Sequence, residues 1–87
     1  MHDIFYDETE LTKTRYVGFF GQNRRFDLAI VQTERFFGKM LVMDLQSGRS
    51  AILGPDDLEE EGYLAYVFDL NEEEEKELHS FLSQIIL

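Results

Sequence analysis

Three arginines in the predicted connections of this chain carry the planar, paired N–H donors that suit carboxylates and phosphates. They are Arg24, Arg25 and Arg49. Two acids, Asp27 and Asp44, are expected at the same end of the fold, where ordinary surface ion pairs would neutralise two of the three charges. The sequence therefore leaves two interpretations open, a small-anion or phosphometabolite-binding module and a set of surface ion pairs.

A second candidate site combines aromatic and basic side chains in one short connection. Arg35, Phe36, Phe37 and Lys39 fall between two predicted strands, where exposed aromatic rings often mark a protein-contact surface. The alternative is that this loop folds onto the core, and at least one of the two rings is expected to turn inward. The loop is therefore a candidate protein-contact site, and its folding onto the core stays open as the other interpretation.

No group of residues offers an acid, a base and a pocket together. His79 follows Glu75 by one helical turn, but two ligands do not make a metal site, and a histidine paired with a surface carboxylate explains the spacing. Ser80 and Ser83 lie near that histidine without an enclosed pocket. Residues 69–74 resemble a calcium loop that lacks its required glycine. We therefore expect a non-enzymatic protein with no catalytic residue, no metal and no cofactor.

The elements that would position these side chains begin with short runs of β-branched, aromatic and aliphatic residues. They predict strands over residues 14–20, 26–33, 40–45 and 50–53. Because the connections are short enough for hairpins, the strands should form an antiparallel meander, with residues 3–7 as a fifth, edge strand. Its first and third loops would share one end of the sheet. The second loop would lie at the other end.

Helices are expected in the C-terminal part. Proline and acids favour a helix that begins at Pro55, and residues 63–70 fit either a helical turn or a strand, of which we favour the helical turn. Asn71 is a good N-cap for an amphipathic helix over residues 72–86. The predicted fold class is α+β, with an antiparallel β-meander of four or five strands packed against C-terminal helices.

Both faces of the predicted sheet carry apolar residues. Leu28 and Ile30 alternate with Ala29 and Val31, whereas a sheet with one wet face normally alternates apolar and polar residues. The sheet is therefore expected to be covered on both sides. The second cover would be residues 56–70, closure into a small barrel, or another subunit, so a homodimer is among the expectations.

Length and charge limit the remaining possibilities. The 87 residues suffice for a single domain, with a β-meander over 1–54 and an acidic helical part over 55–87. The chain has no cysteine, and its acidic N-terminus does not resemble a signal peptide, so a cytoplasmic location is expected. Residues 1–50 are neutral, whereas residues 51–87 hold eleven acids and one base, which accounts for the net charge of −10.

This charge disfavours two classes of partner. A strongly acidic surface repels nucleic acids and anionic membranes, so neither is expected as a partner. The acids are best explained as a solvated surface, and a docking face for a basic protein is the alternative. A protein partner is therefore expected, of unknown identity.

The segment over residues 12–64 resembles a family catalogued as domain of unknown function 3055, found in Bacillus-type bacteria. Its most distinctive pieces here are residues 25–32, RFDLAIVQ, and residues 45–49, LQSGR. The resemblance implies a cytosolic bacterial protein without an assigned function, and it implies no catalytic or binding residues. Together with the residue patterns, it favours a non-enzymatic protein-interaction or regulatory domain, with the small-anion module as the alternative.

Overall fold

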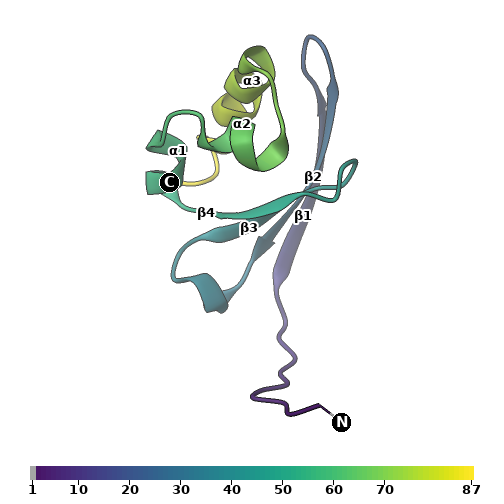
Figure 1. Ribbon diagram of the computed structural model, residues 1–87, viewed down its shortest axis with the longest axis vertical. Helices are drawn as coiled ribbons and strands as arrows, with labels where there is room; N and C mark the ends of the chain where they lie inside the picture. The colour runs from purple at the N-terminus through teal and green to yellow at the C-terminus, as the bar shows by residue number, and fades with distance from the viewer. Residues whose placement is uncertain (1) are drawn as a thin grey trace.

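The computed structural model describes residues 2–87, and its centre is a four-stranded antiparallel sheet in the order β1-β2-β3-β4 (Figure 1). The strands are β1 (Lys13–Phe20), β2 (Arg25–Gln32), β3 (Met40–Asp44) and β4 (Ser50–Leu53). Each strand lies within one residue of its predicted bounds. The α+β class and the meander are therefore confirmed.

The connections between the strands are tight. A 3-10 helix, η1 (Glu34–Phe36), occupies the link between β2 and β3. The link between β3 and β4 is a turn in which Gly48 has a φ of 80° and donates its N–H to the Asp44 carbonyl, 2.8 Å away. Because that φ strains residues with a Cβ, glycine is the natural residue at this position.

Three helices follow the sheet. They are α1 (Pro55–Glu59), α2 (Tyr63–Phe68) and α3 (Glu72–Leu82). The helical expectation for residues 63–70 is confirmed as far as Phe68, and Asp69 ends the helix with a left-handed φ of 56°. The predicted cap is also confirmed, because Asn71 and Glu74 exchange two hydrogen bonds of 2.9 Å. The last helix ends four residues earlier than predicted.

The hydrophobic core lies between one face of the sheet and the helices (Figure 1). Its sheet side consists of Phe26, Leu28, Ile30, Val42, Ala51 and Leu53. Its helical side consists of Leu58, Leu64, Phe68, Leu78, Leu82 and Ile86. Phe19 joins the two sides, because its ring lies 4.9 Å from the rings of both Phe26 and Phe81. All three helices therefore cover the same face.

No helix formed by residues 2–87 lies on the opposite face of the sheet, so the expectation of two covered faces is wrong for the single chain. The segment over residues 56–70 packs beside α3 instead of crossing to the other side. The order β1-β2-β3-β4 also leaves β1 and β4 as separate edges, so the sheet does not close into a barrel. Of the three expected ways to cover this face, only contact with another subunit is still possible.

The predicted edge strand over residues 3–7 is wrong. These residues form no strand and precede the sheet as an extended segment (Figure 1). An apolar pattern makes a strand only where a neighbouring edge pairs with its backbone, and the stretch between residue 3 and β1 makes side-chain contacts instead. Glu10 Oε2 accepts hydrogen bonds from Thr33 Oγ1, at 2.6 Å, and from Glu34 N, at 3.2 Å. The first of these bonds, with the second, lowers the pKa of Glu10.

Candidate functional site

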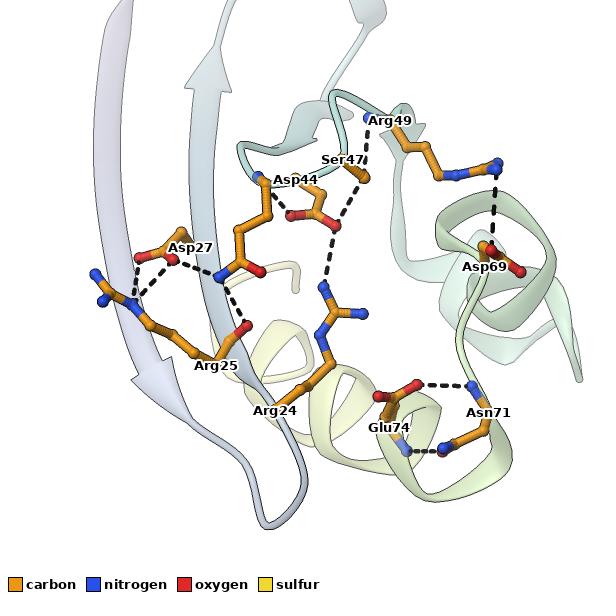
Figure 2. A network of polar contacts seen from close by, with 10 residues as sticks. Arg24, Arg25, Asp27, Asp44, Ser47, Arg49, Asp69, Asn71 and Glu74 are labelled. Carbon is orange, nitrogen blue, oxygen red and sulfur yellow. Dashed lines mark hydrogen bonds and ion pairs between the residues drawn. The ribbon is translucent and has the colours of Figure 1, made fainter.

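Arg24 is held by a buried acid at the turn between β3 and β4 (Figure 2). Asp44 is 3% exposed, and its Oδ2 lies 3.3 Å from Arg24 Nη2 and accepts a hydrogen bond from Ser47 Oγ at 2.9 Å. Its Oδ1 accepts from Gln46 N at 3.1 Å. The guanidinium also lies 4.8 Å from the centre of the Phe26 ring. Arg24 therefore closes the turn against the core.

Arg25 points to the opposite face of the sheet and pairs with a different acid (Figure 2). Its Nε lies 3.0 Å from Asp27 Oδ2, which also accepts a 2.7 Å hydrogen bond from Gln46 Nε2. That bond from Gln46, with the charge of Arg25, outweighs the effect of partial burial and lowers the pKa of Asp27. The carboxylate is thus fully engaged by its neighbours.

Arg49 reaches toward the helices, where its Nη2 lies 4.0 Å from Asp69 Oδ2 beyond the end of α2 (Figure 2). The three arginines predicted as an anion site thus lie near one end of the sheet, as expected from the meander. Each of them turns to a different carboxylate: Asp44, Asp27 or Asp69. The structure does not bring the three guanidinium groups together around one ligand.

The predicted contact loop presents one ring to solvent. Phe37 is 98% exposed and has a left-handed φ of 43°, whereas Phe36 is half-buried. Arg35 turns back to the N-terminal segment, with its Nη1 3.1 Å from Glu8 Oε2 and its guanidinium 5.2 Å from the centre of the Tyr6 ring. The loop therefore exposes an aromatic ring while its arginine is engaged within the chain.

Lys39, the last residue of that candidate set, anchors the start of α1. Its Nζ lies 3.0 Å from Asp57 Oδ2 and 3.5 Å from Asp56 Oδ2. The hydrogen bond to Asp57 is the main reason that the pKa of Lys39 is raised. Burial raises the pKa of Asp57, but the Gly54 N–H, 2.8 Å away, and the ammonium group together hold it below its ordinary value. This lysine therefore has a structural role.

One side of the sheet forms an apolar surface, the open sheet face, which the sequence predicts only in part. We use this name for the apolar strand residues on the side without helices: Tyr16, Phe20, Ala29, Val31, Leu41, Met43 and Ile52. Cross-strand register places Tyr16 beside Ala29, and Ala29 beside Met43. In the sequence, this surface is indicated by the apolar residues on both faces of the predicted strands. Which face would stay uncovered depended on where the helices pack.

The histidine on α3 makes a structural contact. His79 Nε2 lies 2.9 Å from the Leu58 carbonyl oxygen and links α3 to α1. Within residues 2–87, no three histidine or acidic side chains gather as a metal site would require. Glu75, one turn earlier, accepts a 2.9 Å hydrogen bond from Ala65 N instead. Both side chains thus hold helices together.

Comparison with known proteins places the chain in a family. None of the helices formed by residues 2–87 is long and apolar enough to cross a membrane. No curated protein matches the sequence. The family model described as SAV0927-like matches residues 5–84, which is nearly the whole chain and includes every strand and helix described above. The chain therefore belongs to the SAV0927-like family, which is uncharacterised.

Proposed function

We propose that this chain is a non-enzymatic protein-interaction domain of the cytoplasm, and that its open sheet face binds a second copy of the chain. The observation that carries the proposal is an apolar sheet surface with no helix over it. Tyr16 is 75% exposed on this face, and Ile52 is exposed at its β4 edge. Association would remove these side chains from water, which is the main driving force for protein contacts.

The charge distribution favours a second copy as the partner. The strand residues of this side include one charged pair, Arg25 and Asp27, which neutralise each other. The acids of residues 56–77 lie in the helical layer on the other side of the sheet. Two chains that meet through their open sheet faces would therefore hold their acidic layers far apart. Any other face-to-face arrangement would bring at least one acidic layer into the contact.

The size of the face sets the expected strength of the dimer. Strands spaced about 4.8 Å apart and rising about 3.4 Å per residue give this face a footprint of only a few hundred Å². Such an interface falls in the class of weak, transient contacts, below about 1,200 Å² in total. We therefore expect a dissociation constant on the order of 10–100 µM.

The exposed ring of Phe37 is a second contact point that supports the same function. A non-glycine residue in the left-handed region costs energy, and its ring gains nothing from burial within the chain. Contact with a protein partner would offset this cost. We assign the ring to a secondary contact because a single side chain offers much less area than the open sheet face.

Two matched tyrosine variants test the proposal. Tyr16→Glu puts a charge on the open sheet face, whereas Tyr66→Glu puts the same charge on α2, where the tyrosine is 82% exposed. Sedimentation equilibrium over a dilution series should show a monomer–dimer equilibrium for the wild type and for Tyr66→Glu. The Tyr16→Glu chain should be monomeric throughout. A wild type that stays monomeric at hundreds of micromolar, or equal effects of the two variants, would refute the dimer.

We further propose that the SAV0927-like family and the family catalogued as domain of unknown function 3055 are the same. The support is the likeness of residues 25–32 and 45–49, which form β2 and the β3–β4 turn. The ion pairs do not favour a small-anion function at Arg24, Arg25 and Arg49, because each guanidinium is paired with its own acid.

A further inference from the structure

A cavity of about 200 Å³ lies on the helix-covered side of the sheet, between the strands and the segment that follows α3. Its lining consists of Lys13, Arg15, Ile30, Gln32, Met40 and Ile85. Cross-strand register places Lys13 beside Gln32 and Arg15 beside Ile30. The cavity is thus lined by three neighbouring strands and by the chain after α3. It lies on the opposite side of the sheet from the open sheet face.

The two basic residues of this cavity differ from the other basic residues of the chain. Six of the eight form ion pairs: Arg24, Arg25, Arg35, Lys39, Arg49 and Lys76. Within residues 2–87, the side chains of Lys13 and Arg15 make no ion pair and no hydrogen bond. Two exposed cations therefore lie side by side with no acidic side chain within ion-pair distance, in a protein with a net charge of −10.

The other residues that line the cavity indicate which kind of ligand could neutralise Lys13 and Arg15. No acidic side chain lines this cavity, although Glu34 lines an adjoining cavity of about 490 Å³ that shares Lys13, Gln32 and Met40 with it. Ile30, Met40 and Ile85 supply an apolar wall, and the Gln32 amide can donate a hydrogen bond. Cations and an amide beside an apolar wall suit a molecule with an anionic head and an apolar tail.

We propose that this cavity binds a small organic carboxylate, with its head between Lys13 and Arg15 and its alkyl part against Ile30, Met40 and Ile85. Its volume has room for roughly six to ten non-hydrogen atoms, at about 20–30 Å³ each. A carboxylate fits better than a phosphate for two reasons. Phosphate sites usually present several converging backbone N–H groups, whereas the polar residues that line this cavity all lie in strands, with no helix N-terminus among them. A dianion is also repelled more strongly by the acidic chain.

Hexanoate is a suitable probe, with hexanol and inorganic phosphate as comparisons that carry only the tail or only a charged head. Titration followed by amide NMR should show saturable binding of hexanoate, with a dissociation constant on the order of 1 mM and shifts at Ile30 and Gln32. Hexanol and phosphate should each bind about tenfold more weakly, because each lacks half of the contacts. No saturation by hexanoate, or equal affinity for either comparison ligand, would overturn the proposal.

A matched pair of double variants locates the site. Lys13→Gln with Arg15→Gln removes both cations of the cavity, whereas Lys76→Gln with Arg49→Gln makes the same charge change elsewhere on the surface. The first double variant should lose about tenfold in hexanoate affinity and the second should keep it. Equal losses would show only a general charge effect and would refute the site. If the first variant does not fold, the comparison of ligands on the wild type still decides.

The carboxylate site is independent of the proposed dimer. Because the cavity and the open sheet face lie on opposite sides of the sheet, Tyr16→Glu should bind hexanoate as the wild type does. Loss of hexanoate binding in this variant, with the fold intact by circular dichroism, would contradict the placement of the ligand. A monomeric wild type that binds hexanoate would instead refute only the dimer.

Discussion

Asp44 and Arg24 form the most deeply buried ion pair among residues 2–87, with 3.3 Å between Oδ2 and Nη2 and only 3% of the aspartate exposed. Asp44→Ala should lower the free energy of unfolding by about 2–4 kcal/mol, because it leaves a partly buried cation and the donors of Gln46 and Ser47 without their acceptor. Asp44→Asn keeps an acceptor for Gln46 and should cost about 1–2 kcal/mol. Urea unfolding measures both values.

The exposed pair on the other side of the sheet serves as the control for Asp44. Asp27→Ala removes an acid that also contacts an arginine, but the side chain of Asp27 is 24% exposed, against 4% for that of Asp44. It should have a much smaller effect than Asp44→Ala. Equal destabilisation by the two alanine variants would contradict a special role for the buried pair.

Gly21 gives α3 close access to the hairpin between β1 and β2. A Cβ at this position would lie 2.7 Å from Glu77 Cδ, so Gly21→Ala must displace the carboxylate that accepts a 2.6 Å hydrogen bond from Gln22 N. We expect a loss of about 0.5–1.5 kcal/mol. In a Glu77→Ala background the same substitution should be nearly neutral, and a double-mutant cycle of thermal unfolding measures this coupling. Additive effects would refute the steric explanation.

Phe37 adopts a left-handed backbone conformation with its ring in solvent. Phe37→Asn should raise the free energy of unfolding of the monomer by about 0.5–1 kcal/mol, since asparagine tolerates this region better and no buried area is lost. The measurement should be made on the Tyr16→Glu background, where association does not contribute. Destabilisation by this substitution would mean that the ring packs against the chain.

Asp57 makes the free energy of unfolding depend on pH in the acidic range. Its pKa lies below the ordinary value of 3.8, so its contribution is fully present above that value and is lost as the pH falls through the folded-state pKa. The difference in unfolding free energy between the wild type and Asp57→Asn should therefore shrink as the pH falls from about 6 to about 3. Urea unfolding at several pH values tests this. A difference that stays constant or grows would contradict it.

Salt should strengthen the proposed dimer. Two chains with a charge of −10 each repel one another at long range, while the contact itself is apolar. Added sodium chloride screens the repulsion over a Debye length of about 8 Å at physiological ionic strength and leaves the contact intact. The dissociation constant from sedimentation should therefore fall as salt rises. A constant that rises with salt would point to an ion-paired contact instead.

The sheet was predictable from sequence because the alternation of side chains and the turn residues act over short distances. Gly48 marks its turn, and Asn71 with Glu74 marks the start of α3. Residues 3–7 show the limit of such patterns, since their apolar residues suit a strand but no edge pairs with them. Whether a segment becomes a strand depends on a neighbour that local sequence does not specify.

The candidate sites were harder to predict for a related reason. The meander correctly predicted that Arg24, Arg25 and Arg49 would lie near one end of the sheet, but the direction of each side chain depends on the nearest carboxylate. Asp69, the partner of Arg49, comes from a helix end twenty residues later in the chain. The open sheet face depends likewise on helix packing, which the apolar pattern of the strands does not determine.

The placement of all the helices on one side of the sheet also limits how far assembly can proceed. Once two open sheet faces meet, the outer surfaces of the pair are acidic helical layers, and a third copy finds no matching apolar face. Assembly would therefore stop at the dimer. Each dimer carries about twice the charge of a single chain, so dimers would repel one another in solution. An exposed apolar sheet face is an aggregation hazard in many proteins, but association through this face would stop at the pair.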